Sequence, residues 1–338
     1  MKTFLDFMDN PAPTVDEVYE VFYPLTNGEY DDVHIAALLA AIRTRGETFA
    51  DIAGAAHAFI DASRAFPITG DGIVDTAGTG GDGANTINIS TGGSLIAAAG
   101  GVPVVKCGNR SVSSKSGSAD VLEALGIPLD LDIDRAVAQF NAANFTFLFA
   151  PAYHPAVAHV MPVRRALKMP TIFNTLGPIL SPARPQFQLM GIANPAHGRL
   201  IAEVFRDLGR DRALVVHGAG TDEIAVHGST DVWELKDGAI AHYQLTPADL
   251  GVATHALEEL RGGDGAANAD LIRAVFRGEG APAHRDSLAA TAGALFYLTG
   301  RAADFSTGTD AAADLLDDGT VLSWITRHEE ANYGDHSS

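Results

Sequence analysis

The sequence of 338 residues contains little cysteine, little tryptophan and little positive charge. The single cysteine, Cys107, excludes a disulfide bond within the chain and is typical of a reducing compartment. Only 23 Lys and Arg residues oppose 42 Asp and Glu residues, and the net charge of −19 disfavours non-specific nucleic-acid binding. No apolar run approaches the roughly 20 residues that span a bilayer, and the first residues lack the apolar core of a secretory signal. We therefore expect a cytoplasmic protein that binds neither membrane nor nucleic acid.

Apolar residues are plentiful, at 46%, so the chain can form a large core. Its first part predicts helices only. Thr14 and Glu17 form a candidate capping box, in which each satisfies a backbone N–H of the other. A second helix is expected over residues 32–45 and ends at Gly46, and Thr48 is expected to cap a third.

The pattern changes after Pro67. Short β-branched or apolar runs now alternate with helical patterns, which is typical of an α/β fold with a mostly parallel central sheet. The tail from about Asn268 again predicts helices. The expected strands cover residues 72–75, 103–106, 145–149, 213–217 and 232–235.

A glycine-rich loop is expected between a strand and a helix in the run VDTAGTGGDGANTINIST, residues 74–91. The spacing of its glycines fits a dinucleotide fingerprint, but no Asp or Glu occurs between Asp82 and Asp120 to bind a ribose hydroxyl. A Walker A loop is excluded because no lysine follows the glycines. Backbone N–H groups that lead into a helix near Ser90 and Thr91 favour a phosphate ligand over an ordinary surface turn.

A second run, VVKCGNRSVSSKSGSAD, is basic in an otherwise acidic chain. Lys106, Arg110 and Lys115 occur within ten residues, separated by serines and by no acid. Such cations repel each other unless an anion neutralises them, and serine hydroxyl groups suit phosphate oxygens. The alternative is a solvated charged loop. A helix expected near Ser118 would turn its N-terminus toward the same anion.

These two runs resemble those of the anthranilate phosphoribosyltransferases. Three further runs carry the same resemblance: GEYDDVHIAALLAAIRTRGETFADIAGAA, FAPAYHPAVAHVMPVRRAL followed by TIFNTLGPILSPARP, and VVHGAGTDEIAVHG. They follow the family order over residues 27–230. The resemblance implies a small helical domain over residues 1–67, joined by a helical segment around 155–182, and an α/β domain over 68–338. It also implies a homodimer formed through the helical domain.

The family transfers a phosphoribosyl group from 5-phosphoribosyl 1-pyrophosphate to anthranilate, a step of tryptophan synthesis. Charge accumulates on the departing pyrophosphate, so backbone amides, cations and Mg²⁺ are the expected catalytic devices. The resemblance assigns the phosphoribosyl pyrophosphate to Gly78, Gly81, Asp82, Thr86, Asn88, Ile89, Ser90, Thr91, Lys106, Asn109, Arg110, Ser111, Ser113, Ser114 and Ser118.

Two adjacent acids, Asp222 and Glu223, are the hard oxygen ligands that Mg²⁺ prefers, although such acids are more often simply solvated. The resemblance assigns them, with Ser90, to Mg²⁺, with two ions expected per site. It places the anthranilate carboxylate on Arg164 rather than on the adjacent Arg165, because a guanidinium fork suits a carboxylate. Further anthranilate neighbours are Gly78, Asn109, Ala150 and Pro151.

One position departs from the family pattern, since Cys107 stands where the family usually has histidine. A lone cysteine is more often a small buried hydrophobe than a nucleophile. An aryl amine is neutral at pH 7 and its ribosyl partner is strongly electrophilic, so no general base is assigned. The histidines at 154, 159, 217 and 227 are expected to be structural.

Two other functions compete with this interpretation. A pyrimidine nucleoside phosphorylase shares the two-domain architecture and an anion loop, but the paired acids and the GTGGDG form of the loop favour pyrophosphate with Mg²⁺. A nucleic-acid-binding relative would need a broad basic surface, which the acidic composition disfavours.

Overall fold

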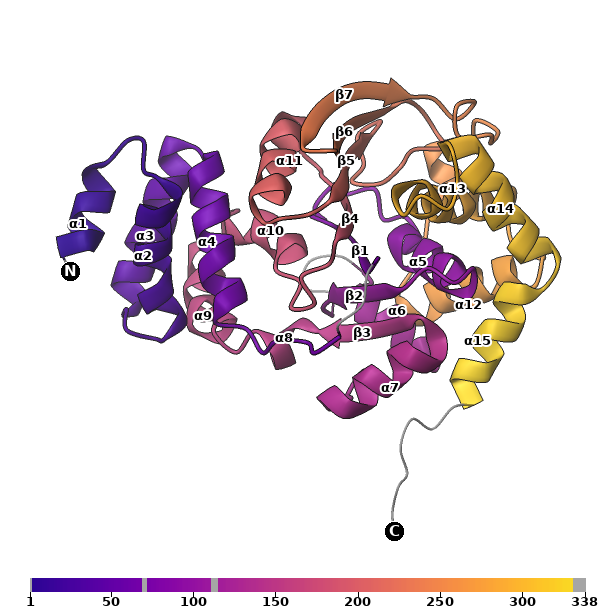
Figure 1. The fold of residues 1–338 in the computed structure, drawn as a ribbon, viewed down its shortest axis with the longest axis horizontal. Helices are drawn as coiled ribbons and strands as arrows, with labels where there is room; N and C mark the ends of the chain where they lie inside the picture. Colours follow the sequence, from indigo (N-terminus) through magenta and orange to yellow (C-terminus); the bar gives the residue numbers. More distant parts are fainter. Residues whose placement is uncertain (1, 69–71, 111–114, 331–338) are drawn as a thin grey trace, which may run out of the picture.

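A computed structural model of the chain describes residues 2–68, 72–110 and 115–330. Figure 1 shows a bundle of helices beside a larger part that is built on one sheet. The bundle contains α1 (Lys2–Asp9), α2 (Val15–Thr26), α3 (Asp32–Arg45) and α4 (Phe49–Asp61). Two later helices pack on it, since α9 (Val157–Leu167) contacts α2 and α3, and α10 (Phe173–Leu176) contacts α4. Segments far apart in the chain therefore build the bundle together.

The sheet has seven strands among the described residues, in the order β3-β2-β1-β4-β5-β6-β7. The first five strands in this order run parallel, and the β5–β6 and β6–β7 pairs are antiparallel. The strands are β1 (Val74–Gly78), β2 (Val104–Gly108), β3 (Phe145–Phe149), β4 (Phe187–Gly191), β5 (Arg212–Gly218), β6 (Thr230–Lys236) and β7 (Ala239–Leu245).

The expected α/β class with a mostly parallel sheet is confirmed, and each of the five expected strands overlaps an observed one. The prediction missed β4 and β7. In β4, with the sequence FQLMG, β-branched residues are missing, and the buried Gln188 side chain donates a hydrogen bond to the carbonyl oxygen of Pro178 (2.7 Å). In β7 mostly exposed side chains follow the sheet edge, so it lacks the apolar run of an interior strand.

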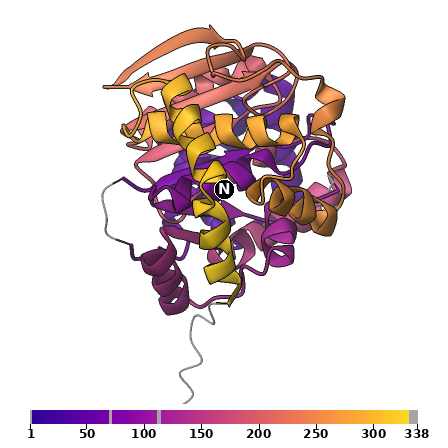
Figure 2. The same ribbon diagram turned by 90° about the vertical axis from the view of Figure 1, so that its right-hand side faces the viewer.

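Helices cover both faces of the sheet. One face packs on α5 (Ile89–Ala99), α6 (Ser118–Ala124), α12 (Gly265–Phe276), α13 (Pro282–Leu298), α14 (Phe305–Asp317) and α15 (Thr320–Glu330). Figure 2 shows the last three, in orange and yellow, on the side away from the bundle. None of the helices in the described ranges is both long and apolar enough to cross a membrane.

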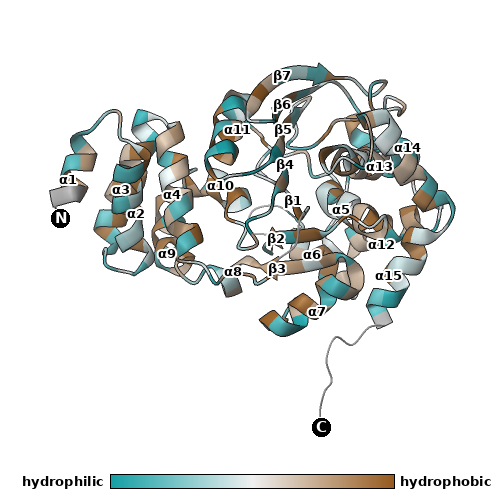
Figure 3. Ribbon diagram, viewed as in Figure 1, coloured by the Kyte–Doolittle hydropathy of each residue, from teal (hydrophilic) through white to brown (hydrophobic). Residues whose placement is uncertain are grey.

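The other face packs on α7 (Ile133–Ala143), on the one-turn α8 (Ala150–Tyr153) and on α11 (Gly198–Asp207). The described residues also include three short 3₁₀ segments, η1 (Gly177–Ile179), η2 (Pro195–His197) and η3 (Leu257–Leu260). In Figure 3, α11 carries both hydrophobic and hydrophilic residues, and its apolar stripe, including Ile201 and Phe205, is buried. This stripe joins the sheet core and the bundle core into one cluster.

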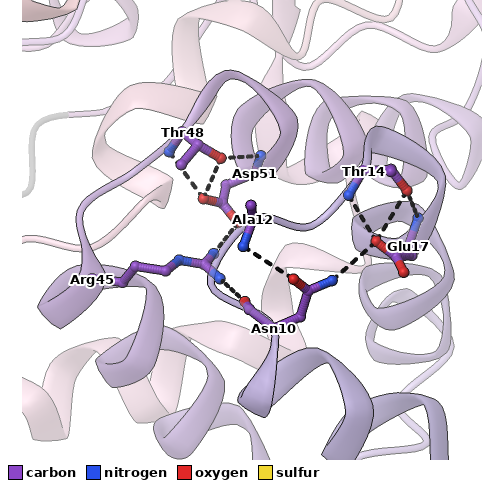
Figure 4. A network of polar contacts seen from close by, with 7 residues as sticks. All are labelled: Asn10, Ala12, Thr14, Glu17, Arg45, Thr48 and Asp51. Atoms are coloured by element: carbon purple, nitrogen blue, oxygen red, sulfur yellow. Dashed lines mark hydrogen bonds and ion pairs between the residues drawn. The ribbon is translucent and has the colours of Figure 1, made fainter.

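Helix ends in the bundle form as the sequence predicts. Thr14 and Glu17 make a capping box, and Thr48 caps α4 together with Asp51 (Figure 4). Asp51 is fully buried and also pairs with Arg45 at the end of α3. A buried carboxylate is costly unless it is paired and hydrogen-bonded, and here the Arg45 guanidinium, the Thr48 N–H and the Thr48 hydroxyl all donate to it.

The order of the parallel strands determines where a ligand site can form. The chain leaves β1 toward β2 on one side and later returns to β4 on the other, so the direction of winding reverses beside β1. Ligands of open α/β sheets bind at the carboxyl ends of the strands at such a reversal. The glycine loop follows β1 and the acid pair follows β5, at this same edge of the sheet.

Candidate active site

The glycine loop connects the end of β1 to α5, which begins at Ile89, close to the expected start. Gly80 and Gly81 adopt positive φ angles of 66° and 82°, a conformation that glycine reaches without strain. The Ile89 side chain is buried in the core, so only its backbone is available to a ligand at this helix end. Thr91 Oγ1 is buried and has no hydrogen-bond partner among the described residues.

Lys106 is a buried cation that lies next to the start of α5, the helix that follows this loop. Its ammonium group donates to the carbonyl oxygen of Thr76 and lies 3.5 Å from Ser90 Oγ. Burial lowers the pKa of Lys106, while the negative charges of Asp75 and Glu223 oppose that shift. The β2 strand therefore holds a positive charge next to the N-terminus of α5.

The basic loop after β2 is only partly described, because Ser111, Ser113 and Ser114 lie outside the described residues. The expectation that its cations stand apart from acids is wrong for Arg110. Its guanidinium pairs with Glu123 on α6 (2.6 Å) and lies 3.7 Å from Asp120. Both acids lie on α6, the helix that directly follows the loop, and this helix places them beside Arg110.

Two other residues that were expected to bind phosphoribosyl pyrophosphate, Asn109 and Ser118, lie at the ends of this loop. Asn109 is exposed, and its side-chain oxygen accepts the N–H of Arg110 (2.8 Å). Ser118 begins α6, as expected, and lies directly against the end of β2, where a Cβ atom on Gly108 would come within 2.4 Å of its Oγ. Both ends of the basic loop thus meet at the carboxyl end of β2.

The adjacent acids Asp222 and Glu223 point at different parts of the site. Asp222 is buried, and one carboxylate oxygen accepts the N–H of Gly80 (2.6 Å). Burial raises the pKa of Asp222 to about 7, and the nearby charge of Asp82 adds to the shift. Glu223 instead accepts the backbone N–H of Ser90 at the start of α5.

The pKa of Glu223 lies well above its ordinary value because of desolvation and then because of the Asp222 charge, while Lys106 opposes the shift. Two acids that are destabilised as anions fit a site for a cation. In the described ranges, no group of three or more His, Cys, Asp or Glu side chains is arranged to hold a metal ion. This donor set fits Mg²⁺, which commonly uses one or two carboxylates together with substrate phosphate oxygens.

Arg164 lies on α9, away from the glycine loop in sequence. It is half-buried, its guanidinium lies 5.5 Å from the centre of the Phe173 ring, and Nη1 lies 3.8 Å from Met161 Sδ. Burial lowers its pKa, and no ion pair involves it in the described part of the chain. Arg165 is exposed. A desolvated guanidinium without an acid partner is suited to an incoming carboxylate.

Cys107 is buried among apolar side chains that include Val105, Leu148 and Tyr153, with Ala150 packed against the same cluster. Burial raises the pKa of its thiol well above the ordinary value, which keeps it neutral. This agrees with the interpretation of Cys107 as a small hydrophobe. Pro151, by contrast, is exposed at the start of α8.

The histidines near the site behave as structural groups where the structure shows their partners. The His154 ring bonds to the carbonyl oxygen of Leu180, and burial lowers its pKa. His217 Nδ1 lies 2.8 Å from the carbonyl oxygen of Ile192. None of these contacts prepares a proton acceptor for a substrate.

Sequence reasoning missed two buried polar residues near the site, Asp75 and Asn268. Asp75 accepts the N–H of Cys107 (3.3 Å), and Asn268 donates to Asn88 (2.7 Å). Asn268 is 180 residues from its partner, so no local pattern could have revealed the contact. For Asp75, the sequence did contain an indication of a buried polar group, because an acid stands within a strand that is otherwise largely buried.

Comparisons with known proteins agree with this geometry. Residues 70–322 match the family described as "Glycosyl transferase family, a/b domain", and residues 6–63 match its "helical bundle domain". The anthranilate phosphoribosyltransferase of Corynebacterium aurimucosum is 67% identical over 334 residues, covering 99% of this chain and 97% of the relative. That of Corynebacterium glutamicum is 68% identical over 339 residues, covering 100% and 97%.

Solved structures give the same result. The crystal structure of the Thermus thermophilus anthranilate phosphoribosyltransferase superposes with a TM-score of 0.92 at 39% identity, covering 97% of this chain and 98% of that one. The Saccharomyces cerevisiae enzyme, in complex with phosphoribosyl pyrophosphate and Mg, has the same fold, with a TM-score of 0.88 at 23% identity and 97% coverage of each chain. The chain therefore belongs to the anthranilate phosphoribosyltransferase family.

Proposed function

We propose that the chain transfers the phosphoribosyl group of 5-phosphoribosyl 1-pyrophosphate to the amine of anthranilate. The products are N-(5-phosphoribosyl)anthranilate and pyrophosphate, in tryptophan biosynthesis. The observation that carries this function is the acid pair, the buried Asp222 and the half-buried Glu223, which faces both the glycine loop and the N-terminus of α5. Acids, backbone amides and a buried lysine meet there, as a metal-bound diphosphate requires.

The donor site lies between the glycine loop and the basic loop. When the C1–oxygen bond of the ribose breaks, negative charge develops on the pyrophosphate, and donors already in place stabilise it without reorganising. Lys106 supplies a fixed charge and Thr91 Oγ1 a hydroxyl that has no partner in the described chain. The remaining contacts are assigned to Gly78, Gly81, Asp82, Thr86, Asn88, Ile89, Ser90, Asn109, Arg110, Ser111, Ser113, Ser114 and Ser118.

Ser90, Asp222 and Glu223 would hold Mg²⁺, with two ions in each site. The bound metal supplies positive charge opposite the departing pyrophosphate. The chain's own contribution is to keep both carboxylates desolvated, so that each favours a cation strongly. The Gly80 N–H fixes one of them and the Ser90 N–H fixes the other.

Anthranilate is assigned to Arg164, Asn109, Gly78, Ala150 and Pro151. Arg164 would bind its carboxylate through the guanidinium fork, which leaves the amine free to face the ribose. No residue needs to remove a proton before the attack, because the aryl amine is already neutral. The buried, neutral Cys107 takes no part in proton transfer.

The dimer is also part of this proposal. Leu5, Tyr23 and Val33 are exposed large hydrophobic residues on α1, α2 and α3, and Val33 is 75% exposed. A second copy packed on the bundle would remove these side chains from water, as the homodimer implied by the family resemblance requires. Sedimentation velocity of Val33→Arg should show monomers where the wild type shows dimers. Dimers in both proteins would contradict the assignment of the interface to the part of the bundle around Val33.

The function is tested by following the loss of anthranilate fluorescence in the presence of phosphoribosyl pyrophosphate. We expect turnover with Mg²⁺ and none after chelation, restored by added Mg²⁺. Turnover of a pyrimidine nucleoside with inorganic phosphate, independent of Mg²⁺, would replace the proposed reaction by phosphorolysis. Absence of both activities in folded protein would also contradict it.

A further inference from the structure

A distant segment of the chain runs beside the end of the glycine loop. The backbone N–H of Ile87 donates to the carbonyl oxygen of Leu260 (2.9 Å), and the N–H of Gly262 donates to that of Asn85 (2.9 Å). A Cβ atom at position 262 would lie 2.9 Å from the backbone of Ile87 and 2.4 Å from Asn268 Oδ1. Only glycine permits this approach, so the segment before α12 is fitted closely to the loop.

Asn268, on α12, is buried at the point where this segment meets the loop. Its side-chain oxygen accepts the backbone N–H of Gly263 (2.6 Å). A backbone N–H can only donate, so this contact decides which end of the Asn268 amide faces Gly263. The NH₂ end must then face the other way, and it donates to Asn88 Oδ1 (2.7 Å).

The orientation of the Asn88 amide follows from that of Asn268. Asn88 Oδ1 accepts from Asn268 and also from Ser116 Oγ (3.0 Å). Its NH₂ group is thereby turned toward the basic loop, where it lies 3.5 Å from the carbonyl oxygen of Ser116. A reversed Asn88 amide would set two NH₂ groups against each other, which leaves buried donors unsatisfied.

We infer that Asn268 is a positioning residue for the transfer reaction, because it fixes the Asn88 amide with its NH₂ group facing the diphosphate. This inference rests on the proposed donor site, in which Asn88 contacts phosphoribosyl pyrophosphate. An amide NH₂ donates to a phosphate oxygen, whereas a reversed amide would present its own oxygen and repel it. Two observed contacts, Gly263 to Asn268 and Asn268 to Asn88, thus carry the orientation from a backbone N–H to Asn88, and the proposed contact of Asn88 with phosphate would carry it to the ligand.

The test is Asn268→Asp, which keeps the shape and the acceptor for the Gly263 N–H. It replaces the NH₂ group opposite Asn88 by a second acceptor, so the Asn88 amide should reverse. We expect the KM for phosphoribosyl pyrophosphate to rise about tenfold and that for anthranilate to change less than about twofold, as for one lost hydrogen bond to a charged group. Asn268→Ala removes the contacts to both Gly263 and Asn88 and leaves the Asn88 amide free to take either orientation, so it should give a smaller rise.

Two controls separate this role from the added charge and from a weakened helix. In an Asn88→Ala background, Asn268→Asp should cause little further rise in the KM for the donor, whereas a purely electrostatic effect would persist. Asp264→Ala removes the exposed N-cap of the same helix and should lower thermal stability without changing that KM.

The inference is overturned if folded Asn268→Asp has the wild-type KM for the donor, or if the rise persists without the Asn88 side chain. An equal rise for anthranilate would overturn it as well. If Asn268→Asp does not fold, Asn268→Ala carries the same comparison. Failure of the proposed function is a different result, since it would appear as absence of turnover in the wild type, which is measured first.

Discussion

Gly78 and Asp222 lie so close together that a Cβ atom at position 78 would come within 2.2 Å of Asp222 Oδ2. That oxygen also accepts the Gly80 N–H, so the carboxylate has little freedom to move aside. We therefore expect Gly78→Ala to displace Asp222 from the proposed metal position. The Mg²⁺ concentration for half-maximal activity should rise about tenfold, as for an overpacked contact of about 1–3 kcal/mol. A Mg²⁺ titration of turnover measures the effect.

The matched control is Gly278→Ala. Gly278 has a φ of 75° and nothing within 4 Å of its Cβ position, so alanine there introduces backbone strain without a clash. This variant should lose some thermal stability and keep the wild-type Mg²⁺ titration. Equal titrations for Gly78→Ala and the wild type would show that the close contact does not govern metal binding.

Sequence patterns were sufficient for the elements that follow local rules. The capping box of Thr14 and Glu17, the cap at Thr48, the helix that ends at Gly46 and the strand over 145–149 are found where apolar periodicity and capping residues place them. The prediction missed β4, because its FQLMG sequence lacks the β-branched residues typical of a strand. It forms a strand because it pairs with parallel strands on both sides. The strand propensity of a short segment does not show which strands will pair with it in the fold.

The site shows the same division. The glycine loop, the basic loop and the acid pair could be recognised from the sequence, because phosphate and Mg²⁺ bind particular residue types that lie close together in the chain. Contacts between residues far apart in the sequence could not be predicted, as for Asn88 with Asn268 and Gly80 with Asp222. The Arg110–Glu123 pair was missed for another reason, since the helix brings back an acid that lies outside the motif.

Replacing the half-buried acid Glu223 tests the metal assignment directly. In Glu223→Gln the amide oxygen can still accept the Ser90 N–H, so the fold should persist. Loss of the charge should lower kcat/KM about a hundredfold, as for other electrostatic groups that act on a developing charge. Turnover and thermal unfolding are measured on both proteins, with the exposed Glu20→Gln as the matched control. Wild-type turnover of Glu223→Gln would refute its role as a ligand.

Arg164 and Arg165 offer a comparison within one helix, since the first is half-buried and the second exposed. Arg164→Ala should raise the KM for anthranilate by at least about tenfold, because a hydrogen-bonded charge pair contributes about 1.5–3 kcal/mol. The KM for phosphoribosyl pyrophosphate should change much less. Arg165→Ala should leave both constants close to those of the wild type. Equal rises for the two substrates in Arg164→Ala would argue against carboxylate binding.

Asp75 makes the stability of the fold depend on pH. Burial raises its pKa from the ordinary value to about 6, although Lys106 and Arg210 oppose the shift, and Cys107 N–H donates to it. The folded state therefore binds a proton more tightly than the unfolded state. The resulting stabilisation is complete below the unfolded-state pKa of about 3.9 and is lost as the pH rises to about 6.

Asp75→Asn keeps an acceptor for the Cys107 N–H and removes the titration. Between about pH 5 and about pH 7.5 the wild type should lose about 1.4 kcal/mol of unfolding free energy relative to this variant. Denaturant unfolding at both pH values measures the difference, and Asp130→Asn, which removes one exposed carboxylate, is the control. If the wild type and Asp75→Asn change in parallel with pH, Asp75 is ionised throughout this range. In that case the charges of Lys106 and Arg210 outweigh its burial.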